Sequence, residues 1–258
     1  GIGLGCGVGL AGGKGKTPAA QSEGAGQASS AAPRPTVTLD PATLGSVEGV
    51  VNFSGKAPTP IKIDTTMDPA CGFAGGGDTY TQQYVVHDGK MANVYVYVKS
   101  GPEAAMAVGD SGRGPVVMAW KGCSYVPHVI AVMMGGCVEF RNDDPTMHNI
   151  HMTPTVAGNP VVDISEGPRG APQTRRFPRP EVMIPVRCNN HPWMSAFINV
   201  SQTPFFAVTG TDGKFELKGM PAGTYTIGAV QEQLGEQDVT VTAKPQAETK
   251  TDFTFAMK

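Results

Sequence analysis

The chain has few charged residues, which make up only 16% of its 258 residues, and its formal net charge is −2. A chain with so little net charge lacks the strongly basic surface that binds nucleic acid, so we expect no nucleic-acid partner. It also lacks long apolar runs, because no stretch reaches the roughly 18 apolar residues of a membrane-spanning helix. No segment of useful length has the helical apolar period, which excludes a helical bundle.

Glycine and proline are plentiful instead, with 34 and 22 residues. Runs of β-branched and aromatic residues alternate with turn residues along most of the chain. This composition favours an all-β fold with many turns. The length suffices for one large β domain or for two of ordinary size.

The five cysteines are an odd number, so at least one stays outside any intramolecular disulfide. Cys6 lies near the N-terminus, and Cys188 lies beside a histidine in a short loop. Cys71 and Cys123 lie in a loop and a turn, whereas Cys137 falls in an apolar strand pattern. We therefore predict a Cys71–Cys123 disulfide, which would stabilise the fold by about 4 kcal/mol. The alternative is three ordinary buried thiols.

The first residues are Gly-rich and look like the tail of an export signal. Gly5-Cys6 resembles the end of a bacterial lipobox, in which Cys6 becomes the lipidated first residue; a plain secreted protein is the alternative. We interpret residues 1–43 as a signal remnant and disordered tether, since their composition cannot support a core. The expected location is periplasmic or at the cell surface, with membrane proximity only through the N-terminal lipid.

Strand patterns begin at residue 44. Residues 45–54 alternate, and residues 93–99 are rich in β-branched and aromatic side chains. Further strand patterns follow between residues 114 and 201. The link from Val156 to Arg179 is rich in Gly, Pro and Arg, and we expect a surface loop there. Its arginines favour a solvated loop, with a docking patch for an acidic partner as the alternative.

In the last part of the chain, Asp212-Gly213 separates two alternating runs and predicts a hairpin turn. The pattern of this block is carried by Asp212, Gly213, Phe215, Leu217, Gly219, Pro221, Gly223, Tyr225 and Ile227. It resembles the carboxypeptidase regulatory-like (transthyretin-like) β-sandwich, whose opening strand pattern matches Gly45, Val47, Gly49 and Val51. The resemblance implies a sandwich built from residues 44–110 and 203–258, with residues 111–202 inserted. Two consecutive independent domains are the alternative.

Two segments of the inserted block carry soft metal ligands. His148 follows a strand-like run, and Cys188, His191 and Met194 lie within one short loop further along the chain. A thiolate and two imidazoles with a weak axial thioether form the ligand set of blue-copper electron-transfer sites. The spacing of the loop lets it supply three ligands, and His148 supplies the fourth. The sequence therefore predicts one type 1 copper ion bound by these four residues.

The same block resembles the cupredoxins, in particular those with a short, amicyanin-like ligand loop. The matching residues are Tyr125, Pro127, Ile130, Val132, Gly135, Val138, Phe140, Asn142, Asp144, His148 and Asn149. The resemblance implies a Greek-key β-sandwich with His148, Cys188 and His191 as strong ligands and Met194 as the weak one. It also implies that the ring edge of His191 reaches the surface as the electron port, with an apolar docking rim. We expect Pro192, Trp193 and Phe197 to form that rim.

Asn149 is expected to tie the two ligand segments together by hydrogen bonding. His151 follows His148 by three residues, so in an extended strand it points to the opposite face and should not bind the same metal. We expect His128, at a strand start, to be a surface or packing residue.

Four protein ligands leave no open position for a substrate, so we expect an electron carrier rather than an enzyme. The predicted partners are redox proteins: a cytochrome, a dehydrogenase or a respiratory complex. With only five histidines, a multicopper enzyme is excluded. Two alternatives remain open. One is copper storage or delivery, aided by Met133, Met134, Met147 and Met152; the other is a structural or interaction protein with a copper-stabilised insert.

Overall fold

The computed structural model describes residues 39–74, 78–109 and 114–257. Cys6 and most of the expected tether lie outside these residues. Residues Pro41–Thr43, which we assigned to the tether, form a short 3₁₀-helix (η1), because the Asp40 side chain accepts a hydrogen bond from the Ala42 N–H at its start. Ordered structure therefore begins slightly before the first strand.

Strands dominate the described part of the chain, where the only α-helices are α1 (Pro69–Ala74) and α2 (Glu103–Met106). The all-β fold class is confirmed. Neither of these helices has the length and apolar character needed to cross a membrane.

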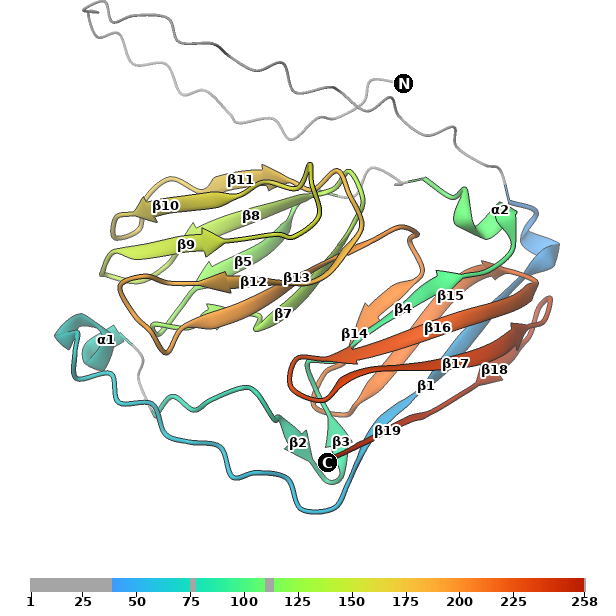
Figure 1. Cartoon of the computed structure of the whole chain (residues 1–258), viewed down its shortest axis with the longest axis horizontal. Coiled ribbons are helices and arrows are strands. Elements are labelled where there is room, and N and C mark those ends of the chain that lie inside the picture. Colours follow the sequence, from blue (N-terminus) through green and yellow to red (C-terminus); the bar gives the residue numbers. More distant parts are fainter. Residues whose placement is uncertain (1–38, 75–77, 110–113, 258) are drawn as a thin grey trace, which may run out of the picture.

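One β-sandwich is built from both ends of the chain, and we call it the outer sandwich (Figure 1). Its first sheet contains β1 (Leu44–Ser54), β2 (Val86–His87), β3 (Lys90–Met91), β15 (Lys214–Pro221), β18 (Glu248–Lys250) and β19 (Phe253–Ala256). Its second sheet contains β4 (Tyr95–Ser100), β14 (Phe206–Val208), β16 (Gly223–Gln231) and β17 (Gly235–Ala243). In both sheets an early strand pairs with late ones: β1 with β15, and β4 with β14 and β16.

The glycine pattern of β1 has a packing reason. A Cβ atom on Gly49 would collide with the Thr251 carbonyl oxygen and with the Phe215 ring, so this close approach requires glycine. On either side, Val47 and Val51 are fully buried in the core of the outer sandwich. The alternation seen in the sequence therefore joins β1 to strands more than a hundred residues away.

The middle of the chain forms a second sandwich, the inner sandwich, with its own hydrophobic core. Its five-stranded sheet contains β7 (Val129–Met133), β9 (His148–Met152), β10 (Val162–Glu166), β12 (Glu181–Arg187) and β13 (Ser195–Ser201). Its four-stranded sheet contains β5 (Val116–Trp120), β6 (Tyr125–Val126), β8 (Cys137–Asn142) and β11 (Gln173–Arg176). Trp120, Phe140 and Ile150 are among the side chains fully buried between the two sheets.

Two sequence expectations about loops are wrong. The link from Val156 to Arg179 contains β10 and β11, which pair with β9 and β8 at the edges of the two inner sheets. Edge strands need few apolar residues, which is why their short polar pattern looked like a loop. The Asp212-Gly213 turn is not a hairpin, because β14 pairs with β4 and β15 pairs with β1 in the other sheet.

A buried polar contact joins the two sandwiches. The Nε2 atom of His128, just before β7, lies 2.7 Å from a carboxylate oxygen of Glu232 in the outer sandwich, and both side chains are almost fully buried. Its Nδ1 lies 3.0 Å from the Ser195 carbonyl oxygen. His128 is thus a packing residue at the interface and not a surface residue.

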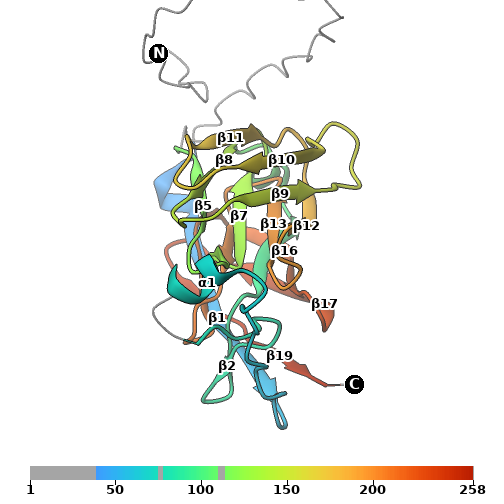
Figure 2. The same ribbon diagram turned by 90° about the vertical axis from the view of Figure 1, so that its left-hand side faces the viewer.

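A long excursion of the outer sandwich reaches the inner one. Residues 56–74 and 78–84, which we call the cap, leave the end of β1, carry α1 and return to β2 (Figures 1 and 2). The structure pairs Cys71 of α1 with Cys123 of the inner sandwich, the disulfide favoured from the sequence. Cys137 is buried in β8, where its apolar strand pattern placed it.

Candidate metal centre

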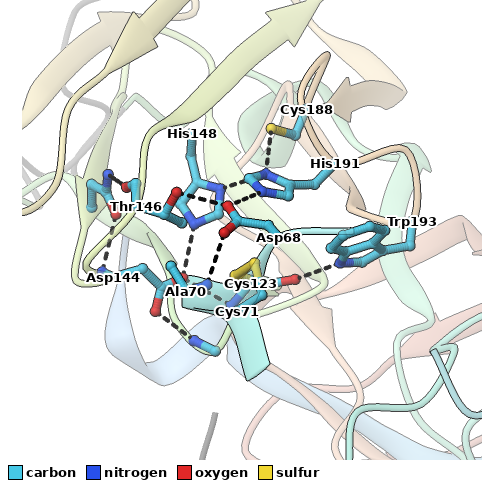
Figure 3. Close-up of a disulfide and its surroundings, with 12 residues drawn as sticks. Asp68, Ala70, Cys71, Cys123, Asp144, Thr146, His148, Cys188, His191 and Trp193 are labelled. Carbon is cyan, nitrogen blue, oxygen red and sulfur yellow. Dashed lines mark hydrogen bonds and ion pairs between the residues drawn. A yellow bond between two sulfur atoms is a disulfide. The ribbon is translucent and has the colours of Figure 1, made fainter. Parts of the chain in front are cut away.

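Three of the predicted ligands converge at one end of the inner sandwich. His148 begins β9, Cys188 follows the end of β12, and His191 lies in the turn that leads into β13. The two histidine Nδ1 atoms are 3.1 Å apart, and the Cys188 Sγ lies 3.5 Å from Nδ1 of His191. All three side chains are buried, with residue exposures of 0%, 4% and 3%. We call these three residues the ligand cluster (Figure 3).

A tight turn holds the loop that bears two of the ligands. The Met194 N–H donates to the His191 carbonyl at 2.9 Å, and the Cys188 N–H donates to the Met194 carbonyl at 3.3 Å. Met194 is itself buried and belongs to the same hydrophobic core as Cys188. The loop therefore keeps Cys188, His191 and Met194 on one compact turn.

Asn149 connects the two ligand segments. Its backbone N–H donates to the Cys188 Sγ at 3.3 Å, and its side-chain oxygen accepts from the Asn189 N–H at 3.3 Å. Its amide nitrogen donates to Asp163 and to the Ile164 carbonyl of β10. The residue thus fixes β9 against both the ligand loop and β10.

Each histidine of the ligand cluster has a carboxylate at its Nε2 atom. Nε2 of His148 lies 2.9 Å from Oδ2 of Asp144, and Nε2 of His191 lies 3.0 Å from Oδ2 of Asp68. A carboxylate is only an acceptor, so Nε2 carries the hydrogen in both rings. Each Nδ1 is then left as the ligand atom facing the thiol, the tautomer that metal binding requires.

The electrostatic environment favours a thiolate in the ligand cluster. Burial on its own raises the pKa of Cys188, but interactions with the His148 and His191 side chains and hydrogen bonds from the backbone of Asn149 and Asn190 outweigh it and lower the pKa to about 6. Hydrogen bonding to His191 holds the pKa of Asp68 below its usual range. A buried thiolate and two imidazoles with free Nδ1 atoms form a soft donor set, which fits a copper ion.

The expectation that His191 reaches the surface is wrong. Its ring is 4% exposed, because Asp68 of the cap covers Nε2 and the Trp193 ring lies beside it with centroids 5.1 Å apart. Trp193 is partly buried and donates from Nε1 to the Cys123 carbonyl at 3.1 Å. The covering segment comes from the other sandwich, so nothing in the ligand loop signals it.

The expected docking rim is dispersed as well. Pro192 is exposed and Trp193 is partly exposed, but Phe197 packs edge-on against His128 at the interface between the sandwiches. The prediction that all three residues form an apolar rim around His191 is therefore wrong.

The remaining histidines and methionines lie apart from the ligand cluster. His151 is on the other face of β9, where its Nδ1 lies 2.8 Å from the side-chain oxygen of Asn189. Met133 and Met152 are buried, whereas Met147 is half exposed, so these sulfur atoms do not share one surface.

Sequence reasoning did not assign a role to either carboxylate. Asp144 carried a weak signal, because it belongs to the pattern around His148. Asp68 lies 123 residues before His191, and the available signal was its position three residues before Cys71, which we predicted to bond Cys123.

No protein-family model matches the chain, and no curated protein matches it. Among solved structures, a Cu-containing nitrite reductase from Thermus scotoductus SA-01 is similar over 33% of this chain, with 26% identity and a TM-score of 0.30. This chain spans only 22% of that reductase. A proline-to-glycine mutant of amicyanin, in the reduced Cu(I) form, is similar over 42% of this chain and 98% of its own, with 19% identity and a TM-score of 0.31. A purple cupredoxin from Nitrosopumilus maritimus is similar over 33% of this chain and 99% of its own, with 20% identity and a TM-score of 0.28.

Proposed function

We propose that this protein binds a single copper ion through His148, Cys188 and His191, with Met194 as the weak axial ligand, and carries electrons one at a time between redox proteins. The observation that supports this proposal is the convergence of two Nδ1 atoms and one Sγ atom in a buried site, with the histidine Nδ1 atoms 3.1 Å apart. Soft sulfur and imidazole ligands suit copper, and copper supplies a couple between +1 and +2.

The surrounding residues hold the ligands before a metal arrives. Asp144 and Asp68 keep the hydrogen of each imidazole on Nε2, and the Asn149 N–H stabilises the Cys188 thiolate. Ligands held by such partners move little between two oxidation states, which favours electron transfer over chemistry on a substrate. The near-complete burial of the ligand cluster also excludes water, as expected for a carrier and not for a hydrolytic metal site.

Electrons need a route from the buried cluster to a partner. Trp193 is the aromatic side chain next to His191, and it is partly exposed. We therefore assign the outlet to Trp193 and the exposed Pro192 rather than to the ring of His191. A cytochrome, a dehydrogenase or a respiratory complex is the expected class of partner.

The Cys71–Cys123 disulfide supports an exported protein, since such bonds persist in oxidising compartments. A periplasmic or cell-surface location, with a lipid on Cys6 as anchor, is part of this proposal. The outer sandwich, which has the transthyretin-like sequence pattern, would serve as the scaffold that presents the copper site.

Copper storage is the second candidate function. It is favoured by the burial of His191 beneath the cap, because a covered ligand slows contact with redox partners. In this role the protein would bind Cu(I) and give it up to a competing chelator.

Adding Cu(II) to the purified apoprotein tests the proposal. An electron carrier should develop an intense thiolate-to-copper band in the visible spectrum and a reversible one-electron wave. Cys188→Ser should lose the band and keep the fold, whereas His151→Ala, the matched control on the same strand, should keep both. A colourless protein that releases Cu(I) readily would support storage. A Cys188→Ser variant that stays blue would exclude the assigned ligand.

A further inference from the structure

The cap brings a single carboxylate to the ligand cluster from the other sandwich. Oδ2 of Asp68 lies 3.0 Å from Nε2 of His191 and accepts a hydrogen bond of 2.8 Å from the Thr146 hydroxyl (Figure 3). The other oxygen, Oδ1, accepts from the Ala70 N–H at 2.8 Å. Both carboxylate oxygens thus accept hydrogen bonds, and the side chain is held with Oδ2 directed at His191.

The disulfide ties this carboxylate to the inner sandwich. Cys71 follows Asp68 by three residues, and its N–H donates to the Asp68 carbonyl at 3.0 Å. Its partner Cys123 donates its N–H to Asp144 at 2.8 Å and accepts a hydrogen bond from Trp193. One covalent bond therefore anchors the cap among the groups that contact both histidines of the ligand cluster.

We propose that Asp68 is a positioning residue for His191, and that the cap tied down by the Cys71–Cys123 disulfide closes the ligand cluster to solvent. The carboxylate holds the His191 ring so that Nδ1 faces Cys188, and the cap covers the ring edge. The part of the proposal that concerns copper rests on the proposed function, whereas closure of the cluster does not.

The first experiment needs no metal. Cys188 is the free cysteine of the described residues and is 4% exposed, so its alkylation by iodoacetamide in the apoprotein, followed by peptide mass mapping, reports opening of the site. Alkylation should be severalfold faster in Asp68→Ala and in the double variant Cys71→Ala/Cys123→Ala. Asp64→Ala is the matched control, because Asp64 is an exposed aspartate of the cap whose side chain accepts a hydrogen bond from the nearby Thr66 N–H.

The second experiment measures copper. Loss of a hydrogen-bond partner of a ligating histidine typically weakens metal binding by about 10–100-fold, and we expect a loss in this range for Asp68→Ala in a Cu(I) competition titration. The reduction potential should rise, because a negative charge that favours Cu(II) has been removed. Asp68→Asn, which keeps an acceptor oxygen, should fall between wild type and Asp68→Ala in affinity, a graded response that a purely structural role would not give.

The outcomes separate the two proposals. If wild type binds copper with the expected band but Asp68→Ala and Asp68→Asn match it in affinity, potential and Cys188 alkylation, the positioning role is overturned and the proposed function stands. If wild type takes up no copper but alkylation responds to Asp68→Ala, the closure stands and the proposed function fails. Because Asp68→Asn perturbs the fold least, it decides the question if the double variant does not fold.

Discussion

The two histidines of the ligand cluster are held by carboxylates of different origin. Asp144 precedes His148 by four residues, is nearly fully buried, and accepts hydrogen bonds from the Gly122 and Cys123 N–H groups. Asp68 is 25% exposed and arrives on the cap from the outer sandwich. One half of the site is therefore built within the inner sandwich, and the other half depends on a contact between the two sandwiches.

The two halves of the site should respond differently to substitution. The Asp144 half is part of the inner core, so losing it affects folding. The Asp68 carboxylate is partly exposed, so losing that side chain affects access and metal affinity more than stability, whereas the disulfide beside it holds the two sandwiches together. The variants below test this division, beginning with the largest expected change in the free energy of unfolding.

Removing the disulfide with Cys71→Ala/Cys123→Ala should have the largest effect. The bond closes a loop between residues separated by 52 positions, so the chain-entropy relation predicts a loss of about 4 kcal/mol in the free energy of unfolding. Urea unfolding of the copper-free protein measures it. A loss confined to the outer sandwich, detected as a separate transition, would show that the cap does not couple the two sandwiches.

Asp144→Ala should come second. It leaves the buried Cys123 N–H and the partly buried Gly122 N–H without an acceptor, at a cost of about 3 kcal/mol. Asp68→Ala should cost less than about 1 kcal/mol because its site is partly exposed. The same urea titration compares the two variants. Equal losses of stability would contradict the division between the Asp144 half, built within the inner sandwich, and the Asp68 half, which the cap supplies.

Glu181→Gln should have a smaller effect than Asp144→Ala and a distinct pH dependence. Burial raises the pKa of Glu181, but hydrogen bonds from Asn159, Thr155 and Val156 outweigh it and lower the pKa. A lowered folded-state pKa gives stability that is present above the unfolded pKa, about 4.3, and is lost as pH falls through the folded value. Wild type should therefore exceed the variant by about 1 kcal/mol at pH 7, with the gap closing below pH ~4.

The control for this prediction is Glu216→Gln, which alters an exposed carboxylate of the outer sandwich. A gap between wild type and Glu181→Gln that persists unchanged at low pH would mean that the charge of Glu181 is not what orders the loop after β9.

The ligand cluster could be predicted from the sequence because its members lie in two short segments whose strand patterns are clear. The pairing of an early strand with late ones could also be predicted, because the glycine pattern of β1 and the residue pattern of β15 indicate one sandwich. Asp68 and the burial of His191 could not be predicted, because they depend on where an irregular segment packs. The edge strands β10 and β11 were missed because they are stabilised by backbone pairing rather than by apolar side chains.

The most direct test of the central claim is a crystal structure of the copper-loaded protein with anomalous scattering measured at the copper edge. We predict one strong anomalous peak, within bonding distance of Nδ1 of His148, Nδ1 of His191 and Sγ of Cys188, with Asp68 still in contact with Nε2 of His191. A principal peak elsewhere, such as at His151, or no peak at the ligand cluster after loading, would contradict the account.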